Sequence, residues 1–360
     1  LLASLAASKL VSCPTALRQE YQPRIVAASD EGEQAMAGFQ LPDGFEVTLW
    51  AAEPLLANPV CLAFDERGRC FVAESFRVHA GVTDIREHMD WLDEDLASRT
   101  VLDRVAMMRR HAGDGFAAYE SERERVRRIE DSDGDGRADR ATVFADAFGE
   151  AASGVGAGLL AQGSQVYYTC IPDLWRLRDD DDDGVAESLD SLAHGFGVNV
   201  ALFGHDLHGL RLGPDGRLYF SIGDRGLSVR TKEGKLLDYP KTGCVLRCDP
   251  DGSNLEVFAS GLRNPQELVF DDYGNLFTGD NNSDGGDRAR FVWILEGSDS
   301  GWRYPYQWIE SPNARGPWNA EKLWQPAHAG QPAYILPPID NLADGPSGLT
   351  YMPGDAWGEA

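Results

Sequence analysis

One short unit recurs along this chain and constrains its fold more than any other feature. Each copy has an apolar strand, an Asp-Gly or similar turn, and a second strand rich in Phe, Tyr and Val. Copies occupy residues 61–74, 158–170, 210–224 and 268–280, and a fifth begins at 348–355. Because self-similar units at intervals indicate a repeat architecture, we expect each copy to form an inner hairpin.

Most of these hairpins are followed by a second pair of strands. The pairs are 126–129 with 141–144, 174–177 with 188–189, and 245–248 with 255–258. Four strands per unit, repeated about every 50 to 100 residues, is typical of a β-propeller blade. We therefore expect an all-β fold, a six-bladed β-propeller that is incomplete at the C-terminus, with residues 45–50 as the strand that closes the ring.

Segments outside the repeat suggest the domain organisation. Residues 78–125 have apolar residues three and four apart, which predicts a helical insertion in the first blade. Residues 1–25 resemble a signal-peptide remnant and leader, and 40–360 would be the propeller. An exported protein, periplasmic or at the cell surface, is the expectation. Cys13 also fits a lipoprotein cleavage site, which would anchor the protein to a membrane.

Composition excludes some classes of function. The chain has 58 acidic against 33 basic residues and a net charge of −25, which argues against a nucleic-acid binder that must neutralise phosphates. A hydrophobic content of 42% is too high for a disordered protein. Cys61 and Cys70 flank one turn, so the sequence allows either a cross-strand disulfide or two buried thiols.

Two acidic loops have the spacing of a calcium-binding loop, with carboxylates at positions 1, 3, 5 and 9 and a Gly at position 6. The carboxylates are Asp131, Asp133, Asp135 and Asp139 in the first loop, and Asp179, Asp181, Asp183 and Glu187 in the second. Neither loop has a Glu at position 12, so we expect structural calcium sites rather than sensors. The alternative is a pair of solvated acidic turns.

Polar residues enter two consecutive hairpins at equivalent positions. His205 and His208 precede the third hairpin, and Arg263 precedes the fourth. Such residues gather at one mouth of a propeller channel. A neutral His can take a proton while an Arg stabilises developing negative charge. The alternatives are two metal-binding histidines or structural ones. After the fourth hairpin, residues 280–287 suit a further calcium ion or a polar turn.

An ordered set of motifs resembles the soluble quinoprotein glucose dehydrogenase and sorbosone dehydrogenase family. The motifs are His205 with 212–226, then 243–247, Arg263-Asn264-Pro265-Gln266, 282–284 and Gly301-Trp302. The whole chain looks closer still to membrane-bound dehydrogenase domain proteins, in which such a propeller precedes helical repeats and a cytochrome c module. The resemblance implies a six-bladed propeller that uses pyrroloquinoline quinone (PQQ) and calcium to oxidise a sugar or alcohol, with cytochrome c as an electron acceptor.

The resemblance also implies roles for individual residues. His205 would be the general base and Arg263 its catalytic partner. The calcium that anchors the quinone would be held around Asp280, Asn281 and Asn282, although these asparagines replace the family's Gly-Pro turn. His208 stands where the family has a small residue, so it would narrow the pocket or add a ligand. The residues expected to contact the cofactor are Arg263, Asn264, Gln266, Asp224 and His208.

A second class of function stays open on the sequence. A calcium-stabilised propeller could bind extracellular glycans or proteins without catalysis. Aromatic residues suited to sugar stacking are Trp302, Tyr304, Tyr306, Trp308 and Trp318. Catalysis requires His205, Arg263 and Asp280 to face the same channel mouth, and simple binding does not.

Overall fold

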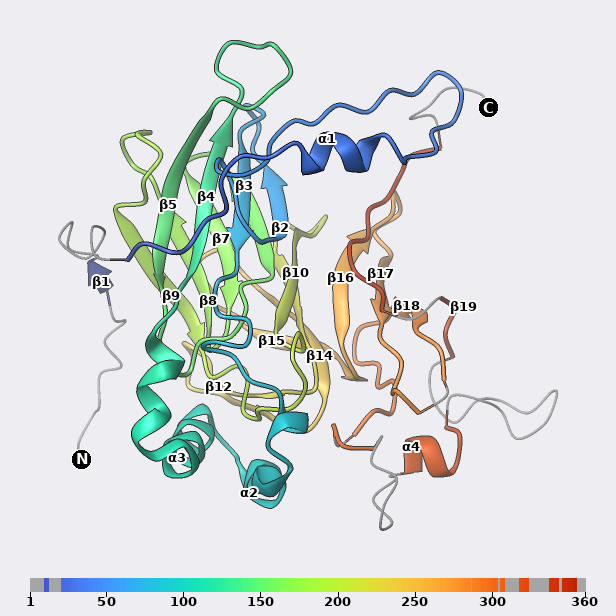
Figure 1. Ribbon diagram of the computed structural model, residues 1–360. Helices are drawn as coiled ribbons and strands as arrows, with labels where there is room; N and C mark the ends of the chain where they lie inside the picture. Colours follow the sequence, from blue (N-terminus) through green and yellow to red (C-terminus); the bar gives the residue numbers. More distant parts are fainter. Residues whose placement is uncertain are drawn as a thin grey trace.

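Four antiparallel sheets of the propeller type dominate the computed structural model, which describes residues 10–12, 21–285, 287–303, 305–307, 317–323, 337–342 and 345–354 (Figure 1). Blade 1 contains β2 (Pro59–Phe64), β3 (Cys70–Glu74), β4 (Glu124–Glu130) and β5 (Arg140–Phe148). Blade 2 contains β6 (Gly158–Gln162), β7 (Gln165–Cys170), β8 (Asp173–Arg178) and β9 (Ser188–His194).

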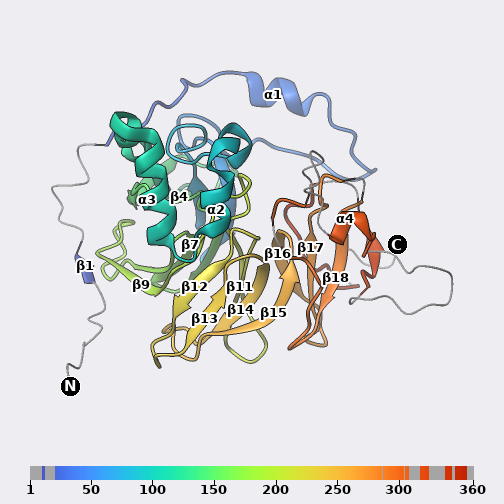
Figure 2. The ribbon, with the colours of Figure 1, turned by 90° about the horizontal axis from the view of Figure 1, so that it is seen from below.

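The remaining two blades follow the same order of strands. Blade 3 contains β10 (Leu207–Leu212), β11 (Leu218–Ile222), β14 (Gly243–Cys248) and β15 (Glu256–Leu262). Blade 4 contains β16 (Pro265–Phe270), β17 (Leu276–Asp280), β18 (Arg290–Ile294) and β19 (Asp340–Asn341). The first strands of consecutive blades contact one another, β2 with β6, β6 with β10, and β10 with β16. The sheets therefore follow one another in an arc around their inner strands (Figure 2), which is the arrangement of a propeller.

The four complete hairpins of the repeat form the inner strands, as the sequence predicts. The three expected outer pairs are β4 with β5, β8 with β9, and β14 with β15. A hairpin of β12 (Leu227–Arg230) and β13 (Leu236–Tyr239), between β11 and β14, was not expected. A short strand, β1 (Leu10–Ser12), pairs with β9 and lies in the segment for which the sequence suggested a leader.

Two expected strands are absent from the described part of the chain. Residues 45–50 form no strand; instead the carbonyl of Trp50 accepts a hydrogen bond from Ala138 N at 2.8 Å, and its ring packs edge-on against Phe64. Residues 345–354 also contain no strand, so the start of a fifth hairpin is not seen there. A strand needs a neighbouring ladder to satisfy its main chain, and neither segment joins a sheet of the described chain.

Helices occupy the expected insertion between β3 and β4. They are α2 (Leu92–Ala97) and α3 (Val101–Ala112), with single 3-10 turns at Ile85–Glu87 and Met89–Trp91 and a longer 3-10 helix at Gly113–Glu120. A reciprocal capping box of Thr100 and Asp103 begins α3. Outside the insertion, the described helices are α1 (Glu31–Met36) and α4 (Pro317–Ala320). In the described chain no helix has the length and apolar character needed to cross a membrane.

The insertion fixes the loop that leads into β10. Asp95 of α2 is buried and its carboxylate accepts the amides of Val200 at 2.8 Å and Ala201 at 3.3 Å. Ile85 N donates to Ala201 O at 3.0 Å, and Phe203 N to the carboxylate of Asp84 at 2.9 Å. Hydrogen bonds to buried carboxylates are among the stronger ones in proteins. The insertion thereby holds the main chain just before residue 205.

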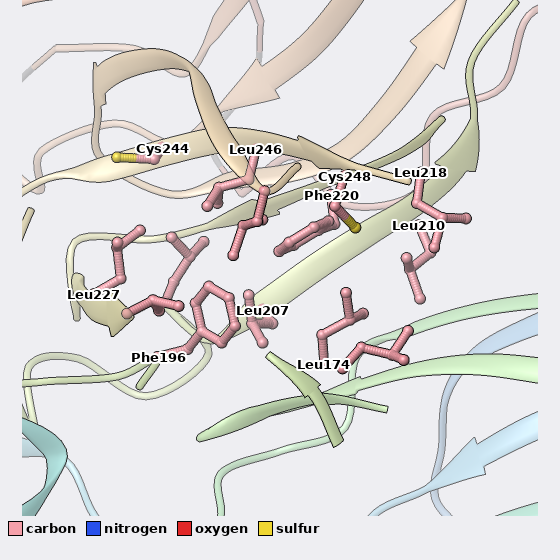
Figure 3. Packing of buried hydrophobic residues seen from close by; sticks show 14 of the residues in the cluster. Leu174, Phe196, Leu207, Leu210, Leu218, Phe220, Leu227, Cys244, Leu246 and Cys248 are labelled. Carbon is pink, nitrogen blue, oxygen red and sulfur yellow. The ribbon is translucent and has the colours of Figure 1, made fainter. Parts of the chain in front are cut away.

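Apolar side chains between blades 2 and 3 form the largest core cluster (Figure 3). Phe196 packs edge-on against Phe220 at 5.8 Å, and Leu207 at the start of β10 lies beside them. Each fully buried side chain of this size stabilises the fold by roughly 1.5–3 kcal/mol. The start of β10 is therefore held in place by a well-packed core.

The described cysteines are free thiols, which settles the question left open for Cys61 and Cys70. The ladder of β2 and β3 pairs Cys61 with Ala73 and Cys70 with Phe64. The two thiols are therefore offset along the hairpin rather than opposite each other.

Candidate functional site

His205 is the centre of a buried polar cluster where β10 begins. It is only 3% exposed, and its Nδ1 lies 2.7 Å from Oδ1 of Asp224. Since an ionised carboxylate can only accept, Nδ1 carries a proton, and in the neutral form of the ring Nε2 has the lone pair. Among the described residues, none makes a hydrogen bond to Nε2. The ring is thus oriented and its second nitrogen is available as a base.

Asp224 orients His205 and is itself held on both sides. Its second oxygen accepts a hydrogen bond from Trp302 Nε1 at 2.9 Å, and its amide donates to Arg263 O at 2.7 Å. The sequence resemblance placed Asp224 among the residues that contact a cofactor. That contact stays a prediction; in the structure both carboxylate oxygens accept from protein donors and the side chain is fully buried.

Arg263 enters blade 4 where His205 enters blade 3. Its buried guanidinium pairs with Asp284 at 2.7 Å, donates to the carbonyl of Asn282, and lies 5.7 Å from the ring centre of Trp302. Trp302 therefore contacts both Arg263 and Asp224. This contact, together with the main-chain bond between residues 224 and 263, brings the predicted base and cation into one cluster.

The carbonyl of Gly204 gathers three side-chain donors. They are His208 Nε2 at 2.8 Å, Asn264 Nδ2 at 3.2 Å and Gln266 Nε2 at 3.4 Å. Burial is the main cause that lowers the pKa of His208, so this ring is held neutral. His208 thus donates to the residue just before His205, and its predicted contact with a cofactor stays a prediction.

Asp280 has a different environment from the one expected of a calcium ligand. Its carboxylate accepts the amides of Arg263 at 3.0 Å and Asn264 at 2.7 Å, and it forms an ion pair with buried Arg290. Neighbouring Asn281 accepts the amide of Asn282 at 2.9 Å. A cation held by Asp280 would have to displace or share these donors. The calcium assignment of residues 280–282 therefore stays a prediction.

Several members of the cluster were not assigned a role from the sequence. Trp302 was considered as part of a motif and for sugar stacking, not as a partner of Asp224, and Arg290 was not noted. Asp206, within the histidine motif, forms a buried ion pair with Arg225 at 2.7 Å. The available signal was the set of motifs itself, since Trp302 lies inside one of them and Asp206 directly follows His205.

The aromatic residues considered for sugar stacking belong to the packing around this cluster. Trp302 and Trp318 are buried and meet edge to face at 5.3 Å, and Tyr306 is buried as well. Their ring faces are therefore not available to a sugar at the surface. Tyr304 and Trp308 lie outside the described residues.

The two acidic loops lie between outer strands, one in blade 1 and one in blade 2. In the first, carboxylate oxygens of Asp131, Asp133 and Asp135 lie within 4.8 Å of one another, and Asp139 is not part of the group. Asp139 instead accepts both the amide and the hydroxyl of Ser132, at 2.9 and 2.6 Å. In the second loop all four predicted carboxylates gather, namely Asp179, Asp181, Asp183 and Glu187.

The cluster around His205 has polar atoms that a ligand could satisfy. Arg263 Nε and Asn264 Oδ1 are buried and lack a hydrogen-bond partner among the described residues. A quinone that carries carboxylates offers hydrogen-bond acceptors for Arg263 Nε, and its negative charge suits a site that contains an arginine. The terminal nitrogens of Arg263, however, already contact Asn282 and Asp284, so ligand binding must exchange or share the exposed partner Asp284.

Fold and site together define a β-propeller with a buried His-Asp pair and a cation at one end of its inner strands. The chain belongs to the family described as Domain of unknown function (DUF7133), whose model matches residues 31–298. No curated protein gives a significant match.

Solved structures similar to the chain are sugar dehydrogenase-like β-propellers, as the sequence resemblance indicated. The PQQ-bound aldose sugar dehydrogenase of Streptomyces coelicolor is 21% identical, with a TM-score of 0.46 over 82% of this chain and 72% of that one. An oxidoreductase of Thermus thermophilus, described as a glucose dehydrogenase, is 18% identical with a TM-score of 0.45 over 83% and 75%. The PQQ domain of Coprinopsis cinerea pyranose dehydrogenase is 12% identical, with a TM-score of 0.39 over 67% and 51%.

Proposed function

We propose that this protein is an oxidoreductase that uses PQQ and calcium to oxidise a hydroxyl group of a sugar or alcohol. The observation that carries the proposal is the His205–Asp224 pair, in which Nδ1 is held at 2.7 Å and Nε2 has no hydrogen bond among the described residues. An oriented imidazole with one available nitrogen is the arrangement that a general base requires.

The chain's own residues have distinct tasks in this proposal. Nε2 of His205 takes the proton of the substrate hydroxyl, and the buried carboxylate of Asp224 stabilises the imidazolium that forms. Arg263 provides a fixed positive charge in the same cluster. Asn264 and Gln266 donate to the Gly204 carbonyl and so hold the main chain just before His205. When bound, PQQ supplies a two-electron acceptor for the hydride.

The wider setting is also part of the proposal. The complete propeller has six blades, the protein is exported, and electrons pass to a cytochrome c partner. Calcium near residues 280–282 anchors the cofactor.

The test is dye-linked turnover of the full-length protein with a panel of sugars and alcohols, with and without added PQQ and Ca²⁺. His205→Ala should abolish turnover but leave PQQ uptake, followed by calorimetry, largely intact. His194→Ala is the matched control, because His194 also pairs with an aspartate, Asp173 at 3.0 Å, yet is exposed. Calcium binding without PQQ uptake or turnover would refute the proposal and favour a recognition module for glycans or proteins.

A further inference from the structure

The acidic loop of blade 2 contains a buried carboxylate oxygen without a partner. Asp179 is 4% exposed. Its Oδ2 accepts the amide of Gly184 at 2.9 Å and Arg128 Nη1 at 3.1 Å, whereas Oδ1 is buried and has no hydrogen bond among the described residues. An unsatisfied buried carboxylate oxygen is costly. A positively charged or hydrogen-bonding partner at Asp179 Oδ1 would therefore stabilise the loop.

Three further carboxylates converge on Asp179. Asp181, Asp183 and Glu187 each place one oxygen within 4.8 Å of the others and of Asp179. Four like charges at this spacing repel one another unless a cation lies between them. Ligands that are all oxygen, with carboxylates at positions 1, 3, 5 and 9, suit calcium better than zinc or copper. A hard divalent cation is the kind of ligand that this donor set suits.

The same loop is bound to blade 1 by arginines. Asp182 pairs with Arg67 at 2.7 Å and also with Arg69, and both arginines lie at the turn between β2 and β3. Asp182 adopts a φ of 63°, which is unusual for a residue with a side chain. The equivalent residue in the loop of blade 1 is a glycine, Gly134, with φ 76°. The loop of blade 2 thus accepts backbone strain where a side chain reaches the neighbouring blade.

Arg128 of β4 makes the second link between the blades. It is 3% exposed and its guanidinium lies so close to Gly184 that an added Cβ would come within 2.7 Å of it. Gly184 has φ +92° and accommodates both the turn and the guanidinium. Besides Glu130 on its own strand, Arg128 pairs with Asp179, the residue with the unpartnered oxygen. The expected cation and the contact between blades therefore share one residue.

We propose that loop 179–187 binds a calcium ion and that this ion fastens blade 2 to the arginines of blade 1. The ion satisfies Asp179 Oδ1 and neutralises the cluster, which keeps Asp179 and Asp182 in place for their arginine partners. This structural role is independent of catalysis at His205.

The loop of blade 1 provides an internal comparison. Both oxygens of Asp131 already accept main-chain amides, from Gly134 at 2.8 Å and Gly136 at 2.8 Å. Asp139 is occupied by the amide and hydroxyl of Ser132. In blade 2 the longer Glu187 accepts the amide of Asp180 at 2.7 Å, and Asp180 has no hydroxyl to occupy its other oxygen. We infer that loop 179–187 has the higher affinity.

The test is calcium titration of the full chain after removal of metal with a chelator, followed by calorimetry and thermal unfolding. Asp181→Asn and Asp133→Asn form a matched pair, because each aspartate is exposed and accepts the amide two residues later at 3.2 Å. Asp181→Asn should raise the calcium Kd of the tightest site at least about tenfold and remove most of the calcium-dependent rise in Tm. Asp133→Asn should leave both nearly unchanged.

Two measurements separate metal binding from a loss of structure. In chelator, Asp181→Asn should unfold at the same Tm as wild type or higher, because it removes repulsion. Calcium should also slow amide hydrogen exchange at residues 65–69 in wild type only. The proposal is wrong if wild type shows no calcium binding, so that water alone meets Asp179, or if Asp133→Asn causes the larger loss. Binding without protection of residues 65–69 would refute the link between blades.

Discussion

Blades 3 and 4 place different chemistry at the same point of the same fold. Where each inner strand is entered, blade 3 has His205 and blade 4 has Arg263. Each side chain contacts the residue two positions beyond the end of the paired strand, which is Asp224 in blade 3 and Asn282 in blade 4. Only the blade 3 pair combines a titratable ring with a carboxylate. The base of the proposed reaction is therefore specific to blade 3.

The position of one aspartate accounts for the difference. Asp224 lies two residues beyond Ile222, the last residue of β11, so its carboxylate reaches the ring of His205. Asp280 is itself the last residue of β17 and stands opposite Pro265 in the ladder, so its carboxylate meets main-chain amides. A shift of two residues along the chain converts a partner of the base into a support for the main chain.

The largest effect is expected for Asp224→Asn. The amide cannot stabilise an imidazolium and can turn its NH₂ toward Nδ1, so kcat should fall by about 10²–10⁴-fold. Asp173→Asn, which changes the partner of the exposed His194, should leave kcat within about twofold. Dye-linked turnover of the PQQ- and calcium-loaded protein measures both. Equal losses in the two variants would remove the distinction between blade 3 and the rest of the chain.

The next effect concerns stability in blade 4. Asp280→Asn leaves the guanidinium of Arg290 buried without its carboxylate, which should lower the free energy of unfolding by about 3–5 kcal/mol. Asp284→Asn removes a half-exposed carboxylate and leaves Arg263 the carbonyl of Asn282 as an acceptor, so it should cost less than Asp280→Asn. Denaturant unfolding of both variants checks this. A mild Asp280→Asn would mean that the aspartate is not a structural support.

Trp302→Phe should lower the free energy of unfolding by an intermediate amount and should also lower activity. It removes the hydrogen bond from Nε1 to Asp224, with a cost of about 1.5–3 kcal/mol, and it should lower kcat because the carboxylate is held less firmly. Trp318→Phe is the matched control, since Trp318 Nε1 donates to Asp287 at 3.2 Å in blade 4. It should lose comparable stability with kcat unchanged. Loss of kcat in both variants would contradict the separation of the blades.

The smallest effect at neutral pH is expected for His208→Gln. Burial lowers the folded-state pKa of His208, so as the pH falls the unfolded chain gains this proton first. Its contribution to stability is complete above the unfolded pKa of about 6.5 and is lost as the pH falls below that value. Gln266, at the equivalent position of blade 4, donates to the same Gly204 carbonyl without titrating. His208→Gln should therefore flatten the loss of stability between neutral and acidic pH.

Denaturant unfolding of His208→Gln at pH 7.5 and 5, beside wild type, measures this slope. If the variant loses as much stability as wild type over that interval, His208 is not a source of the acid sensitivity.

The sequence predicted the hairpins because their information is local. Glycine turns and alternating apolar strands lie within each unit, and the structure confirms the four complete units and their outer pairs. The prediction of a closing strand at 45–50 was wrong, because strand formation also depends on a ladder partner that is distant in the sequence. That His205 and Arg263 lie in one cluster was predictable, because the repeat places them at equivalent positions of consecutive blades.

Other parts of the site could not be predicted because they depend on register and on distant contacts. Asp280 and Arg290 stand directly opposite each other across β17 and β18, which is visible only once the pairing is known. Trp302 reaches Asp224 across 78 residues of sequence. The difference between the two acidic loops rests on Ser132 and Asp180, a position to which the calcium motif assigns no role.

The docking of the insertion has a consequence for the order in which this protein folds. Most strand pairs join neighbouring segments, and such local contacts form quickly. The loop before His205 instead depends on Asp95, 105 residues before Val200. Asp224, the partner of His205, depends on Trp302, which follows it by 78 residues. During synthesis the blades can therefore assemble one after another, whereas the His205 centre can be completed only after Trp302 has left the ribosome.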